Sequence, residues 1–392
     1  MNPDSKPDNI LAASAHRNPY AFYAALVAGP ALVFDAPRKL WIASSAAAVK
    51  QVLGNPACRV RPVAEPVPAA IVGSAAGEVF SHLVRMNEGL RHDAPKLALQ
   101  RFLAGVDLDA VQARTQVLAL QLAGKDDLRG AALSGWAFDV PVMAVADLLG
   151  FGEAELPQVA RWMGDFVACL SPLSTPAQLA AAGDAASALL ERFSELVKDS
   201  IARPGSALAR LRQEAVQAGW HDARSLLCNA IGLLSQTYEA TAGLAGNSIV
   251  ALATQLGLLE AMGREPVRLL QMVQEVSRYD PSIHNTRRFV AEATEVAGIS
   301  LQPGDVVLVL LAAAGRDPAC NARPDEFLLD RKDREVPGFG HGAHQCPGQA
   351  MACAIAAAAV QALLVSGRLK EAASLSWDYR PSMNARIPHF TG

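Results

Sequence analysis

The chain has 392 residues, of which 51% are hydrophobic and 19% are charged, with 35 basic against 38 acidic side chains. Such a composition supports a large buried core and excludes a disordered chain. The net charge of −3 speaks against a nucleic-acid-binding domain, because such domains are usually strongly basic. Only 6% of the residues are aromatic, whereas alanine is abundant, so the composition favours helices.

The N-terminal residues predict neither a secretion signal nor a membrane anchor. Residues 1–18 have no apolar run behind a basic flank, and we expect them to form a polar, loosely held arm. The longest apolar stretches, Val306–Ala314 and Ala354–Val365, are too short or too interrupted to span a bilayer. The six cysteines are scattered without a CxxC pair, which is typical of reduced thiols. We therefore expect a cytoplasmic protein without membrane contact.

The first part of the chain predicts short elements of both kinds. Turn and breaker residues separate apolar runs that are too short for long helices. In chain order we expect a helix from Pro19 to the stop at Gly29-Pro30, strands over Ala31–Phe34 and Leu40–Ala43, a helix over Ala46–Leu53 and a long loop over Arg61–Ala76.

The rest of the chain is predicted to be mostly helical up to about residue 280, with a small β-region after it. No shift in composition marks a boundary, so we expect one domain over residues 1–392. A minor β-region beside a large helical body makes the fold class mainly α with minor β (α+β). The late elements are strands near Arg288–Val290, Glu295–Val296 and Val306–Leu310, a tight turn at Pro303-Gly304-Asp305 and a helix from near Pro347 to about Leu364.

The most specific pattern is Phe339–Gly348, in which three glycines flank Cys346 and a helix is predicted to follow. Glycines permit positive φ and remove side chains that would block a flat, bulky ligand. The free N–H groups and the dipole at the start of the next helix favour a thiolate over a thiol. This run therefore suits a cysteine thiolate that is presented to a large planar ligand.

Two other interpretations of this run stay open at this point. Cys346 could be a buried structural thiol, since free cysteines usually behave as small core hydrophobes. His341 and His344 could join Cys346 in a partial zinc site, although no second ligand pair lies at the usual spacing.

The run Phe339–Gly348 resembles the cysteine-loop pattern FGxGxHxCxG of the cytochrome P450 family at every fixed position. The resemblance implies a cytochrome P450-like helical fold, a b-type haem (iron protoporphyrin IX) and Cys346 as the axial thiolate of the iron. Further matches are Glu275-Val276-Ser277-Arg278 to the family's ExxR pair, Arg316-Asp317-Pro318, Phe327 and Asp330-Arg331 to the meander before the cysteine loop, and Pro19-Tyr20 and Trp41-Ile42-Ala43 to soluble bacterial members.

The resemblance also implies which residues bind the haem. The haem propionates need cationic or hydrogen-bonding partners, because buried carboxylates are costly without them. His92 and Lys96 are spaced i, i+4 and would share one face of a helix, with lysine replacing the arginine of the family's HxxxR pair. The implied cofactor-binding set is His92, Lys96, Arg288 (with Arg287 as fallback), Phe339, Gly340, His344, Cys346 and Gly348.

Glu275 and Arg278 are spaced i, i+3 on a predicted helix, so their side chains can meet. By themselves they could be a solvated surface pair worth a few tenths of a kcal/mol. The resemblance implies instead a buried network with the meander that supports the cysteine loop.

The segment Leu233–Gly243 resembles the long helix on the distal side of the haem, but it departs from the usual Ala/Gly-Gly-x-Asp/Glu-Thr pattern. Glu239 keeps the acid, Gln236 and Thr237 replace the small pair, and Ala240 stands where the alcohol is usual. Proton delivery would then need another hydroxyl or a water chain. We predict Glu239, Thr237 and Gln236 as the catalytic residues; the alternative is that the polar pair only faces a neighbouring helix.

The resemblance implies a monooxygenase that oxidises a medium-sized organic molecule, a secondary metabolite or xenobiotic, with O2 and electrons from a ferredoxin or flavodoxin. Two alternatives remain: a haem–thiolate enzyme with atypical chemistry (peroxide-driven oxidation, ring coupling, dehydrogenation or nitrogen-oxide chemistry), and a non-catalytic haem binder or partner-recruitment platform. The predicted pocket walls are Val63–Val72, Phe166–Leu173, the distal helix, Ser282–Asn285 and Met383–Asn384.

Overall fold

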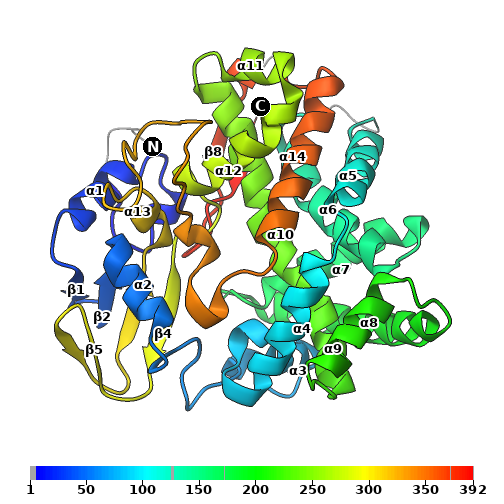
Figure 1. The fold of residues 1–392 in the computed structure, drawn as a ribbon, viewed down its shortest axis with the longest axis horizontal. Helices are drawn as coiled ribbons and strands as arrows, with labels where there is room; N and C mark the ends of the chain where they lie inside the picture. The colour runs from blue at the N-terminus through cyan, green and yellow to red at the C-terminus, as the bar shows by residue number, and fades with distance from the viewer. Residues whose placement is uncertain (1–5, 125–127, 172, 371, 392) are drawn as a thin grey trace. The chain divides into compact units, whose positions relative to one another are not determined.

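The computed structural model in Figure 1 describes residues 6–124, 128–171, 173–370 and 372–391. The chain divides into two compact units. The first, which we call the sheet unit, contains Met1–Arg59, Ala119–Ala137 and Glu239–Gly392. The second, the helical unit, contains Val60–Leu118 and Phe138–Tyr238. The single domain over residues 1–392 stays a prediction.

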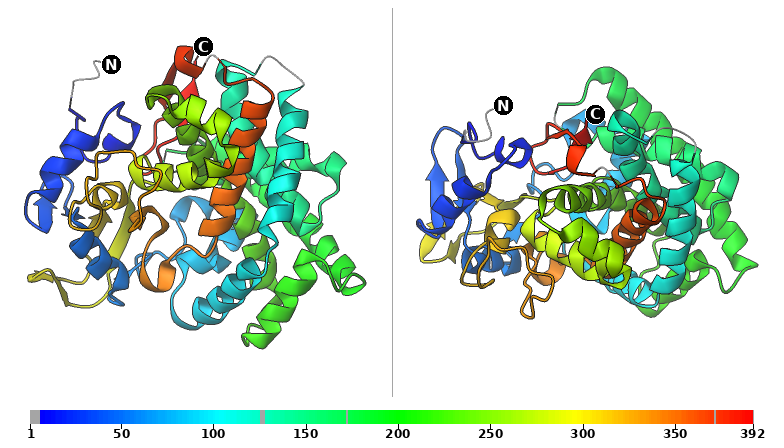
Figure 2. Two further views of the ribbon diagram at one scale, coloured as in Figure 1. Left: turned by 45° about the horizontal axis from the view of Figure 1, so that its top comes forward. Right: turned by 90° about the horizontal axis from the view of Figure 1, so that it is seen from above.

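A five-stranded sheet with the order β1-β2-β7-β4-β3 organises the sheet unit. Four of the predicted strands, two from the first part of the chain and two from the last, are confirmed in this sheet and lie side by side, as the blue and yellow arrows in Figures 1 and 2 show, whereas the two-residue strand β3 was not predicted. Only the β2–β7 pairing is parallel. The strands are β1 (Leu32–Asp35), β2 (Leu40–Ala43), β3 (Cys58–Arg59), β4 (Thr286–Val290) and β7 (Val306–Val309).

Two short antiparallel hairpins complete the β-structure, and three of their four strands were not predicted. Each of the four strands has three residues, which is too short for an alternating apolar pattern to stand out. The hairpins pair β5 (Thr294–Val296) with β6 (Ile299–Leu301) and β8 (Trp377–Tyr379) with β9 (Pro388–Phe390).

Helices pack beside this sheet, and α12 lies against α14. The last helix starts at Gln349 with Gly348 as its N-cap, so the predicted start near Pro347 was two residues early. Apolar side chains from α2 and the strands form one continuous core. The helices of the sheet unit are α1 (Tyr20–Val27), α2 (Ala46–Gly54), α11 (Leu258–Arg264), α12 (Leu269–Tyr279), α13 (Leu311–Gly315) and α14 (Gln349–Val365).

The prediction of a loosely held arm over residues 1–18 is corrected for its described part. Ile10 and Ala13 are buried in a core cluster with Leu308 and Leu310 of the sheet region. Arg386 donates hydrogen bonds to the carbonyl oxygens of Ser14, His16 and Arg17. Residues 1–5 lie outside the described residues. Ile10 and Ala13 are apolar residues within a polar sequence, and no periodic pattern predicts that they are buried.

The helical unit holds the helices of the middle of the chain. Within this unit α7 packs on α8, α4 on α9 and α3 on α8. Its helices are α3 (Ala75–His82), α4 (Asp93–Ala104), α7 (Leu156–Ala168), α8 (Pro176–Ile201) and α9 (Ala207–Gln217), and three longer helices have residues in both units: α5 (Leu108–Ala123), α6 (Gly130–Leu149) and α10 (Ala223–Thr254). The predominance of helix over the short strands confirms the class mainly α with minor β.

Two helical stretches among the described residues, Gly130–Leu149 and Gly342–Val365, are long and apolar enough to cross a membrane by length and composition. A bent pair, Ala223–Thr254 with Leu258–Arg264, passes the same test only when its two helices are taken together. The most apolar windows of the two single stretches are 72% and 61% buried inside the structure. Their apolar side chains therefore contribute to the protein core here.

Candidate functional site

The cysteine loop, residues 339–348, lies in the sheet unit, where one short 3-10 turn leads into it, a second lies within it and α14 follows it. The turns are η7 (Pro337–Phe339) and η8 (Gly342–His344). The loop is closed by a hydrogen bond from the Cys346 N–H to the Phe339 carbonyl oxygen at 2.7 Å. Gly340 and Gly342 have φ of +77° and +69°, which side chains other than glycine rarely tolerate. The backbone of this loop therefore requires glycine at positions 340 and 342, as the sequence predicts.

Glycine also allows close contacts on both sides of the loop. A Cβ on Gly342 would lie 3.3 Å from the carbonyl oxygen of Leu53, at the end of α2, so the loop rests directly on that helix. A Cβ on Gly348 would lie 4.0 Å from the Sγ atom of Cys346. A larger side chain at position 348 would therefore extend beside the sulfur, where an iron-bound porphyrin would have to fit.

Cys346 is the exposed thiol among the six cysteines, all of which lie in the described part of the chain. Burial raises the pKa of Cys353 to about 12 and that of Cys169 to about 11, so those thiols stay protonated. The interpretation of Cys346 as a buried structural thiol is therefore wrong. Within the described residues, no group of three or more His, Cys, Asp and Glu side chains could hold a metal ion.

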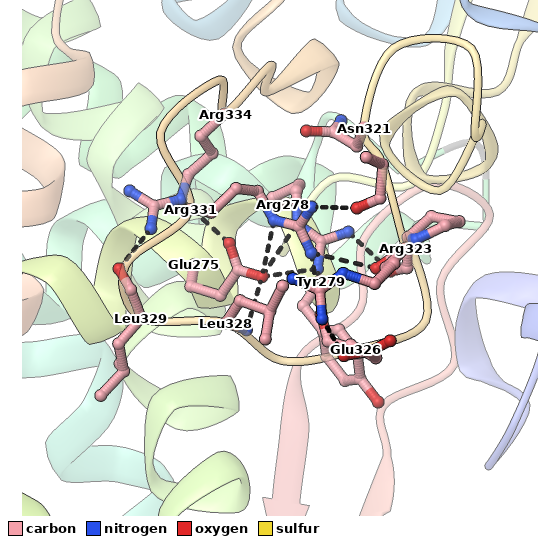
Figure 3. Close-up of polar contacts among 12 residues, drawn as sticks. Glu275, Arg278, Tyr279, Asn321, Arg323, Glu326, Leu328, Leu329, Arg331 and Arg334 are labelled. Carbon is pink, nitrogen blue, oxygen red and sulfur yellow. Dashed lines mark hydrogen bonds and ion pairs between the residues drawn. The ribbon is translucent and has the colours of Figure 1, made fainter.

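A buried ion network joins α12 to the meander that precedes the cysteine loop (Figure 3). Glu275 of α12 accepts hydrogen bonds from Arg278 at 2.6 Å and from Arg331 at 3.2 Å through Oε1, and from Arg334 at 2.9 Å through Oε2. The side chains of Glu275 and Arg278 are both 0% exposed. The predicted buried network between the ExxR pair and the meander is confirmed, and the surface-pair alternative is wrong.

The network binds the meander through backbone atoms as well as through charges. Arg278 donates to the carbonyl oxygens of Pro324 at 2.8 Å and Glu326 at 3.0 Å, and the Leu328 N–H donates to Glu275 at 3.1 Å. Burial of Glu275 disfavours its charge, but the Arg278 hydrogen bonds and charge outweigh that effect, and its pKa is lowered. Glu275 therefore stays ionised and holds the residues that lead into the cysteine loop.

Two of the predicted propionate partners lie in the sheet unit. Arg288 is a buried residue of β4, and its Nη1 donates to the Arg287 carbonyl oxygen at 2.9 Å. Successive side chains of a strand point to opposite faces, so Arg287 and Arg288 cannot both serve the same ligand. Arg287 instead lies with its Nη2 3.9 Å from the Met383 sulfur. His344, within η8, is half-buried.

The other two predicted propionate partners lie in the helical unit. His92 and Lys96 are buried at the start of α4, and the Lys96 N–H donates to the His92 carbonyl oxygen at 2.7 Å. This helical bond confirms that both residues share one face. The His92 Nδ1 lies 2.9 Å from the Asp93 carboxylate. That these two residues and Arg288 surround one haem stays a prediction.

These residues fit the chemistry that a haem requires. Within the sheet unit, the donor set consists of a single exposed thiol ahead of a helix and of the cationic side chain of Arg288, which is otherwise costly to bury. The glycine at position 348 keeps the space beside the sulfur clear. A thiol, open space beside it and a buried cation are features that a haem–thiolate protein needs. Lys96 is a second buried cation, in the helical unit, and its place at the same haem stays a prediction.

On the distal helix, Gln236 and Thr237 turn their polar groups back onto the backbone of α10. The Gln236 Nε2 donates to the Gly232 carbonyl oxygen at 3.1 Å, and the Thr237 Oγ1 donates to the Leu233 carbonyl oxygen at 2.8 Å. Such bonds to the preceding turn are common for polar residues within helices. The predicted part of both residues in proton delivery stays a proposal.

Glu239 and Ala240 are half-buried on α10, whereas Thr241 is buried at 2% exposure. Each residue of a helix is rotated by about 100° from the one before it, so Thr241 has different surroundings from Ala240. Thr241 therefore does not simply take over the position of the absent alcohol. The catalytic part predicted for Glu239 stays a proposal.

The predicted pocket walls fall in both units. Ser282–Asn285 and Met383–Asn384 belong to the sheet unit, whereas Val63–Val72 and residues 166–171 and 173 belong to the helical unit. Residue 172 of the predicted wall lies outside the described residues. Their contact with a substrate stays a prediction.

The sequence reasoning missed two parts of the site. Arg334 completes the set of arginines around Glu275 but lies 59 residues away in the chain, outside the matched motif. Asn247 joins two loops to α10, with partners 33 and 139 residues away. No local pattern predicts contacts of this kind, although a polar residue inside an otherwise apolar helix could have drawn attention to Asn247.

Comparison with known proteins agrees with this geometry. Residues 266–370 match the family model described as Cytochrome P450. The biotin biosynthesis cytochrome P450 of Bacillus subtilis (strain 168) is 25% identical over 266 residues, 68% of this chain and 67% of that protein. Cytochrome P450 144 of Mycobacterium tuberculosis (strain ATCC 25618 / H37Rv) is 31% identical over 63% of this chain and 57% of its own length. The 6-deoxyerythronolide B hydroxylase of Saccharopolyspora erythraea is 28% identical, over 66% and 63%.

Solved structures show the same fold over nearly the whole chain. The crystal structure of CalO2 matches with a TM-score of 0.81 and 24% identity, covering 97% of both chains. That of P450BioI, in complex with an acyl carrier protein ligated to hexadec-9Z-enoic acid, matches with a TM-score of 0.79 and 22% identity, covering 95% of this chain and 97% of that one. These likenesses confirm the predicted fold.

The fold and the cysteine loop together define a haem–thiolate protein. The chain belongs to the cytochrome P450 family and is of the bacterial type. These relatives support the predicted oxidoreductase of the P450 monooxygenase family. The matched regions span 57–67% of the length of these three relatives.

Proposed function

We propose that this protein is a monooxygenase that inserts one atom of O2 into a medium-sized organic molecule. The balanced reaction takes a substrate C–H bond, O2, two electrons and two protons to an alcohol and water. A ferredoxin or flavodoxin supplies the electrons. The observation that carries the proposal is the exposed Cys346 thiol in a glycine-bearing loop ahead of α14. The haem b that this loop would bind supplies the activation of oxygen.

The chain's own residues have separate tasks in this proposal. Cys346 binds the iron as thiolate, with its negative charge favoured by the N-terminus of α14. Lys96, Arg288 and His344, together with His92, neutralise the propionates and fix the haem orientation. Glu239 is the acid on the distal helix that can hold a proton for the reaction. The Glu275 network keeps the loop in place and touches no reactant.

The location and the partners follow from the same class. We place the protein in the cytoplasm, with a medium-sized organic substrate such as a secondary metabolite or xenobiotic and a ferredoxin or flavodoxin as partners. Neither nucleic acid nor a membrane takes part. The composition and the burial of the long apolar helices support this assignment.

The thiolate ligand is tested by the spectrum of the reduced, CO-bound protein. Wild-type protein should give the red-shifted Soret band of a thiolate ligand, and Cys346→Ser should lose that band. Cys320→Ala is the matched control, because Cys320 is half-buried and its thiol donates to the Ala314 carbonyl oxygen at 3.1 Å. A colourless wild-type protein after haem supplementation, or an unchanged band in Cys346→Ser, would overturn the proposal.

A second candidate function is haem–thiolate chemistry that does not follow the usual proton delivery. The observation that favours it is Ala240 in place of the alcohol, with the Thr237 hydroxyl bonded to its own helix. Turnover can be compared with NAD(P)H, ferredoxin reductase and ferredoxin against turnover with peroxide alone. Product from the ferredoxin system only supports the monooxygenase, whereas product from peroxide only supports the second candidate. No product from either, with a bound protein partner, would favour a non-catalytic haem platform.

A further inference from the structure

Two segments of the sheet unit that are far apart in the sequence form one continuous wall. We call residues 280–285 and 383–387 the paired segments. The His284 N–H donates to the Asn384 carbonyl oxygen at 2.8 Å, and the Arg386 N–H donates to the Ser282 carbonyl oxygen at 2.8 Å. Ile283 and Ala385 form an antiparallel bridge between these two bonds. The paired segments therefore behave as one piece of backbone.

The C-terminal part of α10 touches this wall without intervening side chains. A Cβ on Gly243 would lie 2.6 Å from the Ser282 Cβ and 3.1 Å from the Arg386 carbonyl oxygen. A Cβ on Gly246 would lie 3.0 Å from the Pro388 Cδ. Real Cβ atoms essentially never approach to 2.6 Å, and 3.0 Å is an unusually tight contact, so glycine at position 243 permits the close approach of the helix and glycine at position 246 favours it.

One carboxamide joins the helix to both segments. Asn247 is 1% exposed, and its Nδ2 donates to the Asp280 carbonyl oxygen at 2.9 Å and to the Arg386 carbonyl oxygen at 3.2 Å. Its Oδ1 is buried without a hydrogen-bond partner in the described structure. Turning the amide over would place this oxygen against the two carbonyl oxygens, so the donor pair fixes the orientation.

The arrangement shows that the two donated hydrogen bonds outweigh an unsatisfied acceptor. Leaving a buried polar atom unpaired costs the free energy of removing it from water. An apolar side chain of similar size would avoid that cost but would leave the two carbonyl oxygens without this donor. The role of the Asn247 amide is therefore to donate two hydrogen bonds, one to each of the paired segments.

We infer that Asn247 is a positioning residue that sets the distance between α10 and the paired segments. α10 carries Glu239 about two turns before Asn247. The paired segments include Ser282–Asn285 and Met383–Asn384, the predicted substrate-facing walls. The inference rests on the proposed function: by fixing this distance, Asn247 sets the space for the substrate beside the distal helix, and it does not touch the reactants itself.

The first test measures amide hydrogen exchange and needs no haem. In Asn247→Leu we expect the exchange of the His284 and Arg386 N–H groups to rise at least tenfold, with exchange in α14 unchanged. Ser248→Ala is the matched control, because Ser248 is equally buried but its hydroxyl donates at 2.7 Å to Leu244 of its own helix. Exchange in Asn247→Leu equal to that of Ser248→Ala would overturn the inference.

The second test uses the haem-loaded protein and two probes that bind iron. Imidazole needs little space, whereas 4-phenylimidazole must fit its ring against the pocket wall. We expect Asn247→Leu to change the Kd of 4-phenylimidazole at least fivefold and that of imidazole less than twofold. Equal changes for both probes, or no change, would contradict a positioning role.

Asn247→Ser keeps one donor in a smaller side chain and serves if Asn247→Leu does not fold; its effects should have the same direction and a smaller size. The two proposals fail in different ways. A wild-type protein that binds no haem contradicts the proposed function, while the exchange experiment still tests Asn247. A haem-loaded protein with unaltered exchange and unaltered probe affinities contradicts the positioning role alone.

Discussion

At the scale of single residues, the backbone of the cysteine loop decides which side chains are tolerated. Gly340 has φ +77° and ψ −171°, a region that is open almost only to glycine. Gly342 has positive φ and also rests on the backbone of Leu53. The glycines therefore carry a structural demand that is independent of any ligand, and they place Cys346 at the same time.

Substitution of Gly340 by alanine should destabilise the loop. We expect Gly340→Ala to lower the free energy of unfolding by about 1–3 kcal/mol, because alanine must adopt a strained conformation. Urea unfolding followed by circular dichroism measures the change. In Gly183→Ala, within α8 and with open space around the added Cβ, the same replacement should be neutral or stabilising. Equal effects of the two substitutions would contradict the argument.

His284 makes stability depend on pH. Its side chain is fully buried, and burial, followed by the charges of Arg386 and Arg316, lowers its pKa well below the ordinary value of 6.5. The folded state therefore keeps His284 neutral under conditions in which the unfolded chain binds a proton. The groups that face it are Tyr23, whose hydroxyl lies 2.9 Å from Nδ1, Asp280, whose carboxylate lies 4.0 Å from Nε2, the ring of Tyr20, and the two arginines.

The sign of the effect follows from which state binds the proton. Above pH 6.5 neither state is protonated at this residue and stability is unaffected. As the pH falls below 6.5, the unfolded state gains a proton first, so the free energy of unfolding drops by up to about 1.4 kcal/mol per pH unit. Urea unfolding between pH 7 and pH 5 should show a shallower slope in His284→Gln. Parallel slopes for the two proteins would contradict this assignment.

At the scale of elements, α12 and the meander form one charged unit. Glu275 is the carboxylate that three guanidinium groups share, while Arg278 also binds meander carbonyl oxygens. A buried ion pair of this kind adds little over an apolar core, but its partial removal leaves buried charge uncompensated. The network therefore fixes the path of the meander more than it adds to stability.

Removal of the carboxylate should be costly. We expect Glu275→Gln to lower the free energy of unfolding by about 3–5 kcal/mol, because three arginines then lose their shared anion. Glu326→Gln, which breaks an exposed pair with Arg323 at 3.0 Å, should cost less than about 1 kcal/mol. Urea unfolding compares the two variants. A loss in Glu275→Gln as small as that of Glu326→Gln would show that the network is not a single unit.

At the scale of the whole molecule, contacts between distant parts of the chain assemble the sheet unit. Arg386, near the C-terminus, binds Asp280 at 2.6 Å and the carbonyl oxygens of the N-terminal segment. Asn247 joins α10, from the middle of the chain, to the same region through its hydrogen bonds to the carbonyl oxygens of Asp280 and Arg386. The N-terminal arm is thus held by residues from the end of the chain, contrary to the loosely held arm that its polar sequence predicts.

Truncation of the arm tests this arrangement. Removal of residues 1–17 takes away the three carbonyl oxygens that accept from Arg386 and the apolar contacts of Ile10 and Ala13. We expect the midpoint of thermal unfolding to fall by a few degrees, because several hydrogen bonds and buried apolar contacts are lost together and each 1 kcal/mol shifts the midpoint by roughly 2–4 °C in chains of 150–250 residues and by less in longer ones. An unchanged midpoint after this truncation would contradict an anchoring role.

The sequence by itself determined the features that short patterns encode. The glycines of Phe339–Gly348 indicate that their loop contains positive φ angles. The i, i+3 spacing of Glu275 and Arg278 indicates that their side chains meet on one helix turn. Helix and strand periods predicted the fold class and the main strands of the sheet. These signals are local, because each depends on residues within a few positions of one another.

Only the tertiary structure decided which distant residues meet. It placed Arg334 on Glu275, joined Asn247 to two loops, paired β8 with β9, and turned Gln236 and Thr237 back onto α10. Partners tens to more than a hundred residues apart leave no periodic trace in the chain, and three-residue strands are too short to have a period. Such contacts arise from packing, where the burial of each polar group requires a partner that only the folded chain can bring to it.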